Sequence, residues 1–168
     1  QGAIVAERYD GAASATSPAS SWSVAKSFTS ALVGIALSEG LIPSIDEPMT
    51  TYFPGWAGTP REAITLRHVL HMESGLEWNE SYDPSSASSS DVIEMVATQP
   101  DQLAFAASRP AGVAPGTDFN YSSGDTMLLS GVIEAATGMS AGAYARAKLL
   151  DPIGIGALDW WQDAEGHS

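Results

Sequence analysis

The feature that most restricts the fold is an apolar stripe at helical spacing between Ser23 and about Leu37. The apolar residues of this stripe recur at steps of three and four and are Val24, Phe28, Leu32, Ile35 and Ala36. Such spacing is typical of a helix that buries one face. Gly40 follows the stripe, at a place where a residue in left-handed conformation commonly ends a helix. We expect Ser20 or Ser21 to cap the start of this helix.

The start of the helix carries a hydroxyl and an amine one turn apart. Ser23 lies in the first turn, and Lys26, three residues on, projects from the same face. The N–H groups and the partial positive charge of a helix N-terminus favour negative charge developing on a serine oxygen. A serine nucleophile also needs a base, and a lysine in a site poor in water can lose its proton near neutral pH. The two residues are therefore a candidate nucleophile and base.

A solvated lysine beside an ordinary first-turn serine is the alternative interpretation of this pair. The chain has 22 Ser and two Lys, so a serine three residues before a lysine occurs by chance with odds of roughly a quarter. However, Lys26 precedes Phe28 in a segment with no other charge until Glu39. A lone lysine in such a segment is harder to explain as part of a solubilising face.

Further helices are predicted where a Ser or Thr that can act as a cap precedes apolar residues at helical spacing. The expected caps and ends are Thr65 with Ser74–Gly75, Ser90 with Val96, Ser122 or Ser123 with Gly138, and Ser140 with Leu150. Residues 2–9 are predicted to form a strand that ends at the turn signal Asp10–Gly11. Two prolines exclude a continuous helix over residues 41–48.

Two histidines, His68 and His71, fall in the helix after Thr65 at a spacing of three, which can in principle hold a metal. No third ligand is apparent nearby, and neither Glu73 nor Glu77 completes a recognised pattern. We therefore predict structural histidines and no metal site. The sequence also contains no Walker, GxGxxG, HExxH or GxSxG pattern, so no cofactor is expected.

Three ordered segments carry a resemblance to a known family. They read SVAKSFTS over residues 23–30, LRHVLHMESGL over 66–76 and PGTDFNYSS over 115–123. In this order they resemble the Ser-x-x-Lys motif, the LRHLLxMxSGL segment and the PGxxFxYSN segment of the serine β-lactamase and penicillin-binding superfamily. The resemblance is strongest to the class C branch, with its esterases and 6-aminohexanoate-dimer hydrolases.

The resemblance implies an α/β (α+β) fold of the β-lactamase/transpeptidase type. This chain would supply the N-terminal strands, the nucleophile helix and the helical subdomain. Family members usually run well beyond 168 residues. Residues 1–168 are therefore interpreted as the N-terminal part of a single domain, without its C-terminal sheet and third motif.

The resemblance also implies roles for individual residues. Ser23 would be the nucleophile, and Lys26 and the hydroxyl of Tyr121 would move protons between the nucleophile and the leaving group. Without the resemblance, Tyr121 reads as a packing residue. Where β-lactamases have Tyr-x-Asn, this chain has Ser123 as the third residue. A serine lacks the amide that contacts the acyl side chain of a β-lactam, and is compatible with an esterase or amidase.

Trp78 and Tyr82 precede a serine-rich polar segment at residues 85–90. Taken alone, they read as packing residues under a loop. In the 6-aminohexanoate-dimer hydrolases the corresponding region lines the substrate cleft and supplies a tyrosine near the scissile amide. The resemblance therefore makes Ser123, Tyr82 and Trp78 candidate substrate-binding residues.

Composition limits the partners. A formal net charge of −13 argues against nucleic acid or an anionic membrane surface. No apolar run approaches the roughly 20 residues of a membrane span, and no basic-then-apolar leader is present. Zero Cys excludes disulfides but leaves the compartment open between cytoplasmic and secreted or periplasmic.

The sequence thus predicts a serine hydrolase that cleaves a small-molecule ester or amide through an acyl-enzyme on Ser23. The remaining segment of the same enzyme is an expected partner. Two alternatives stay open, namely a penicillin-binding D-Ala-D-Ala peptidase or sensor, and a catalytically silent scaffold of the same fold.

Overall fold

The computed structural model describes residues 2–83, 85 and 90–167, and these residues are mostly helical. The α-helices are α1 (Val24–Ser38), α2 (Leu66–Leu70), α3 (Asp91–Thr98), α4 (Gln102–Ser108), α5 (Ser123–Thr137) and α6 (Ala141–Ala145). Short helical turns are η1 (Met49–Thr51), η2 (Pro54–Trp56), η3 (Pro60–Ala63) and η5 (Arg146–Leu150). No described helix is both long enough and apolar enough to cross a membrane.

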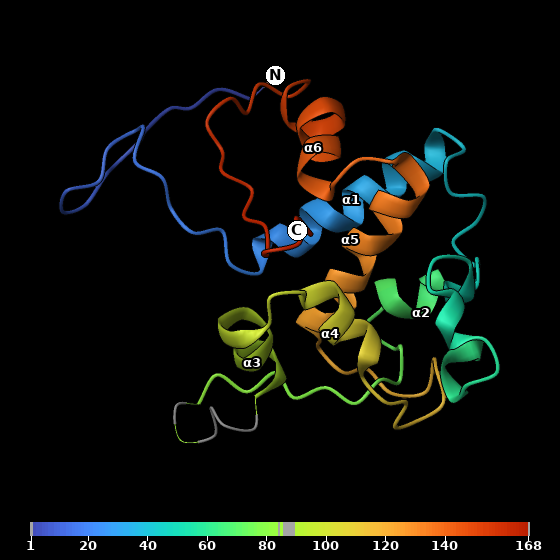
Figure 1. The fold of residues 1–168 in the computed structure, drawn as a ribbon. Helices are drawn as coiled ribbons and strands as arrows, with labels where there is room; N and C mark the ends of the chain where they lie inside the picture. Colours follow the sequence, from blue (N-terminus) through green and yellow to red (C-terminus); the bar gives the residue numbers. More distant parts are fainter. Residues whose placement is uncertain (1, 84, 86–89, 168) are drawn as a thin grey trace.

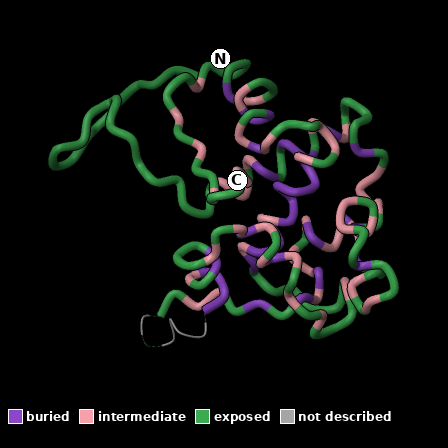
Figure 2. Tube along the Cα trace, viewed as in Figure 1, coloured by how far each residue is buried: buried purple, intermediate pink, exposed green. Residues whose placement is uncertain are grey.

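Helix α5 forms the centre of the molecule and packs against α1, α2, α4 and α6 (Figure 1). Its buried side chains and those of α1 form the middle of one core, which Figure 2 shows in purple. The fully buried members from these two helices are Leu32, Val33, Ala36, Leu128, Val132 and Ile133. Packing of α1 against α5 brings segments about a hundred residues apart in the sequence to one place.

Most of the predicted helix ends are confirmed by their caps. Ser122 accepts a hydrogen bond from the Asp125 N–H at 2.9 Å, and Gly138 ends α5 with a φ of 70°. Ser90 and Ser140 cap α3 and α6 through the same type of contact. These contacts join residues three apart, so they form as soon as the first turn does.

Two helix predictions were wrong in detail, and one helix was missed. The residue that caps α1 is Ser23 rather than Ser20 or Ser21, and its side chain makes no capping hydrogen bond. Helix α2 ends at Leu70, before the Ser74–Gly75 end that the sequence suggested. Helix α4 was not predicted at all, although Asp101 caps it by accepting from the Ala104 N–H at 2.7 Å.

The predicted strand at residues 2–9 is absent from the described structure, which contains only two isolated bridges, Pro48 with Thr65 and Leu76 with Ala111. Residues 2–9 belong to the extended arm drawn in blue in Figure 1, and Figure 2 colours this arm green because it is exposed. A strand needs a neighbour to pair its N–H and C=O groups. None of the described segments pairs with this arm, so the expectation that this chain supplies the N-terminal strands is corrected.

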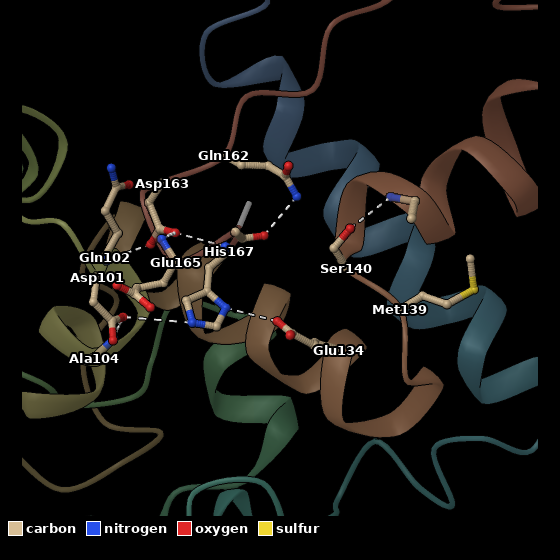
Figure 3. A network of polar contacts seen from close by, with 12 residues as sticks. Asp101, Gln102, Ala104, Glu134, Met139, Ser140, Gln162, Asp163, Glu165 and His167 are labelled. Carbon is tan, nitrogen blue, oxygen red and sulfur yellow. Dashed lines mark hydrogen bonds and ion pairs between the residues drawn. The ribbon is translucent and has the colours of Figure 1, made fainter.

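The C-terminal segment folds back over α4 and α5 (Figure 3). The Asp163 carboxylate accepts from the Gln102 N–H at 2.8 Å, and the Ala164 N–H donates to the Pro100 carbonyl at 3.1 Å. The ring of His167 lies 2.9 Å from a carboxylate oxygen of Glu134 on α5. These contacts tie the end of the described chain to the helical core.

Candidate active site

The predicted nucleophile lies where the chain turns sharply into α1. Trp22 has a φ of 46°, a left-handed value that residues other than glycine rarely adopt. Ser23 follows and is exposed. Because its side chain does not cap the helix, its hydroxyl is free for other contacts, and its N–H donates to no acceptor among the described residues. Lys26, one turn on, donates to Ser23 Oγ across 3.3 Å.

The other half of the site is the start of α5. Because Ser122 caps this helix, Ser123 is its first residue. Lys26 Nζ donates to Ser123 Oγ at 2.9 Å and lies 5.1 Å from the centre of the Tyr121 ring. The structure therefore brings Ser23, Tyr121 and Ser123 together around the side-chain nitrogen of Lys26.

The segment after α2 holds the approach to α5 in place. The Asn120 N–H donates to the Met72 carbonyl at 2.9 Å, and the Ser74 hydroxyl donates to Asp125 at 2.8 Å. The three sequence segments that carry the family resemblance thus meet in space. Their meeting is long-range, since these contacts join residues about 50 positions apart.

A residue that sequence reasoning missed, Glu80, connects this cluster to the loop before α3. Its Oε1 accepts from Ser123 Oγ at 2.5 Å, and its Oε2 accepts from the Ser123 N–H at 2.9 Å. The Tyr82 hydroxyl donates to Oε1 at 2.6 Å, and Trp78 Nε1 donates to Oε2. The sequence did contain one signal. Trp78, Glu80 and Tyr82 are spaced two residues apart, so in an extended segment their side chains lie on the same side.

These donors keep Glu80 ionised. Burial is the largest single influence and by itself raises the pKa of a carboxyl group. The hydrogen bonds from Ser123, Tyr82 and Trp78 together outweigh burial, and the pKa of Glu80 is lowered as a result. The pKa of the Tyr82 phenol shifts in the opposite direction. Burial and the neighbouring Glu80 carboxylate raise the pKa of Tyr82 to about 12.

The two candidate cleft residues differ in their exposure. Tyr82 is 59% exposed and offers its ring to solvent. Trp78 is only 9% exposed, and its ring packs edge-on to Phe105 and directly against Gly124 of α5. Its contact with the site is made through its indole N–H on Glu80.

The histidines of the second segment serve the local structure. The ring of His68 accepts from the Thr65 N–H at 3.1 Å, while the Thr65 hydroxyl accepts from the His68 N–H, so the two form a reciprocal cap on α2. His71 is exposed beside Glu73. Within the described part of the chain, no three His, Asp or Glu side chains gather closely enough to hold a metal ion.

Comparison with known proteins decides the family. The sequence model described as Beta-lactamase matches residues 1–168. The chain belongs to the beta-lactamase family. This family assignment agrees with the order of the three segments in the sequence.

Relatives of this beta-lactamase-family chain include proteins named as hydrolases. The 6-aminohexanoate-dimer hydrolase of Paenarthrobacter ureafaciens is 29% identical over 138 residues, which are 76% of this chain and 35% of the relative. The structure of a D-stereospecific amidohydrolase from Streptomyces sp. is 28% identical with a TM-score of 0.61, over 78% of this chain and 41% of that chain. The octameric penicillin-binding protein homologue from Pyrococcus abyssi is 29% identical with a TM-score of 0.59, over 79% of this chain and 30% of that chain.

Each match covers a larger share of this chain than of the relative. This beta-lactamase-family chain spans between about a third and two fifths of the length of the hydrolases that it matches. The similarity therefore extends over most of this chain but over the smaller part of each relative.

Proposed function

We propose that this chain carries the nucleophile and proton-transfer residues of a serine hydrolase that cleaves an ester or amide bond. The observation that carries the proposal is the position of Lys26 Nζ, 3.3 Å from Ser23 Oγ and 2.9 Å from Ser123 Oγ, beside the ring of Tyr121. A serine hydroxyl, an amine and a phenol within reach of one another are the groups that acyl transfer needs. Relatives named as an amidohydrolase and a dimer hydrolase support the same reaction class.

The reaction proceeds in two steps. Ser23 Oγ attacks the carbonyl carbon while the neutral amine of Lys26 takes the hydroxyl proton, giving a tetrahedral intermediate. The unpaired Ser23 N–H, at the positive end of α1, contributes to stabilising its oxyanion. Collapse expels the alcohol or amine, which takes a proton from Tyr121 or Lys26, and leaves an acyl group on Ser23. Water then attacks the acyl carbonyl carbon while Lys26 or Tyr121 takes a proton from it. The bond between the acyl carbon and Ser23 Oγ breaks, the same proton passes to Ser23 Oγ, and the carboxylic acid leaves.

Esters and linear amides are better candidates than β-lactams. Where a β-lactamase presents an amide to the acyl side chain, this chain has Ser123, whose only hydroxyl proton is donated to Glu80. Tyr82, exposed beside Glu80, is the proposed side chain for contacting the substrate, and the buried Trp78 donates to the same carboxylate. A D-Ala-D-Ala peptidase or penicillin sensor is the second candidate, favoured by the similarity to a penicillin-binding protein homologue.

The test is covalent labelling of Ser23. The intact mass of the chain is followed during incubation with a fluorophosphonate, for wild type, Ser23→Ala and Lys26→Ala, and for a longer natural chain that contains this sequence. We expect a single adduct that is lost in Ser23→Ala and forms at least about 100-fold more slowly in Lys26→Ala, because general base catalysis contributes about 10²–10⁴-fold.

A control and the opposing outcomes complete this test. Ser27→Ala, an exposed serine of the same helix, should label at the wild-type rate. Labelling that persists in Ser23→Ala would refute the nucleophile assignment. If neither this chain nor the longer natural chain is labelled in its wild-type form, the catalytically silent scaffold is favoured. Hydrolysis of p-nitrophenyl esters without D-Ala-D-Ala cleavage separates the esterase from the peptidase.

A further inference from the structure

We propose that Glu80 is a positioning residue of this site, which holds Ser123 and, through it, Lys26 in register with Ser23. The effect of Glu80 on catalysis rests on the proposed function. The structural part of the proposal is that Glu80, on the loop before α3, determines where the Lys26 amine lies, and this part rests on the contacts alone.

The contacts form a chain with a defined direction. A carboxylate can only accept hydrogen bonds, so the single hydroxyl proton of Ser123 is donated to Glu80 Oε1, 2.5 Å away. The lone pairs of Ser123 Oγ then face away from Glu80 and accept from Lys26 Nζ at 2.9 Å. Lys26 Nζ reaches Ser23 Oγ at 3.3 Å. Without Glu80, the Ser123 hydroxyl can rotate and present its proton to the amine instead of a lone pair.

Glu80 is itself held from four directions. Ser123 Oγ and Tyr82 donate to Oε1, while the Ser123 N–H and Trp78 donate to Oε2. Both oxygens are therefore occupied, and the side chain has little rotational freedom left. Such a carboxylate is suited to orient a neighbour, and its lowered pKa makes it a poor acceptor of the Ser23 proton.

A purely structural role is the competing interpretation. The carboxylate of Glu80 also accepts from the first N–H of α5, where a negative charge stabilises a helix. Removal of Glu80 would then lower stability without changing the position of Lys26. The two roles differ in their dependence on the Ser123 hydroxyl, which only positioning requires.

The first measurement is a double-mutant cycle. Rates of fluorophosphonate labelling are compared for wild type, Glu80→Gln, Ser123→Ala and the double variant, with thermal melting of each. We expect Glu80→Gln to slow labelling by about 10- to 100-fold, the effect of misplacing a reacting group by about 1 Å. In the Ser123→Ala background the same change should have little further effect. An equal loss in both backgrounds would overturn the proposal.

The second measurement follows the amine directly and does not need a reactive nucleophile. The chain has two lysines, Lys26 and Lys148, and the second is paired with Glu39 at 2.6 Å, far from Glu80 in sequence. The ratio of Lys26 to Lys148 acetylation by acetic anhydride is measured by peptide mass spectrometry. Glu80→Gln should raise this ratio several-fold, because Lys26 is released from its contacts, and an unchanged ratio would count against positioning.

Two further variants make the result interpretable. Glu80→Asp keeps the charge but shortens the side chain, and it replaces Glu80→Gln in the test if that variant does not fold. We expect Glu80→Asp to slow labelling by less than Glu80→Gln would. Glu77→Gln neutralises an exposed carboxylate of the same loop and should match wild type in both measurements. An altered acetylation ratio with no labelling in any variant would sink the hydrolase function and leave the positioning role standing. Wild-type labelling together with an unaltered acetylation ratio in Glu80→Gln would overturn the positioning role and leave the hydrolase function standing.

Discussion

Asp125, two residues after Ser123 on α5, is a buried carboxyl group whose ionisation affects the fold. It is 2% exposed, and only one of its carboxylate oxygens has a partner among the described residues, the Ser74 hydroxyl at 2.8 Å. Burial raises the pKa of Asp125 from 3.8 to about 7, and the hydrogen bonds from Ser74 offset only part of that effect. The folded chain therefore binds a proton here that the unfolded chain releases.

The free energy of unfolding should consequently fall as the pH rises from about 4 to about 7, by an amount on the order of 4 kcal/mol from this group. The sign follows because, over this range, the folded state binds more protons than the unfolded state. Asp125→Asn removes this dependence and should be more stable than wild type at about pH 8 and no more stable at about pH 4. Urea unfolding at the two pH values measures the difference.

Asp118→Asn, at an exposed position, is the control for this experiment and should leave the pH dependence unchanged. A wild-type stability that rises steadily between these pH values, or an Asp125→Asn variant less stable at the alkaline one, would contradict a protonated Asp125.

At the scale of elements, the start of α5 is positioned by close contact with the loop before α3. A Cβ added at Gly124 would lie 2.7 Å from a carbon of the Trp78 ring, closer than side chains approach in proteins. Glycine therefore lets the helix backbone rest directly on the indole. This contact places Ser123 beside Glu80 and so couples packing to the geometry of the site.

Two glycine-to-alanine changes should have opposite effects. Gly124→Ala should destabilise the fold by about 1–3 kcal/mol, because a rigid buried ring cannot move away. Gly34→Ala, within α1 where an added Cβ meets nothing within 4 Å, should stabilise by about 0.5–1 kcal/mol. Denaturant unfolding of both variants measures this pair. Equal stabilisation by the two changes would show that α5 does not rest on Trp78.

At the scale of the whole molecule, the end of the described chain is held to the core by few contacts. His167 and Glu134 are 21% and 44% exposed, so their pairing contributes modestly. The hydrogen bond from the Ala164 N–H to the Pro100 carbonyl forms only while this segment lies against the core. Local opening of this segment requires these contacts and the Asp163–Gln102 hydrogen bond to break.

Glu134→Gln should therefore speed hydrogen exchange of the Ala164 N–H a few-fold, corresponding to about 0.5–1 kcal/mol, with the α5 amides unaffected. Glu165→Gln, exposed in the same segment, should leave the exchange rate unchanged. Exchange followed by NMR checks this, and equal effects of the two variants would exclude a specific role for the His167 contact.

The sequence by itself determined the features that depend on near neighbours. Caps such as Ser122 and Ser90 act over three residues, and the Ser23–Lys26 spacing follows from one helical turn, so local patterns were sufficient. The family resemblance was also evident from three ordered segments, and the family match over residues 1–168 confirms the family.

Only the tertiary structure decided which distant groups meet. Ser123, the second hydrogen-bond partner of Lys26, is 97 residues away in the sequence. Glu80 was overlooked because no short motif contains it. The predicted strand at residues 2–9 was wrong for the same reason, since a strand exists only where another segment pairs with its backbone. Helices satisfy their own hydrogen bonds locally, whereas strands and polar clusters depend on neighbours that packing alone brings into place.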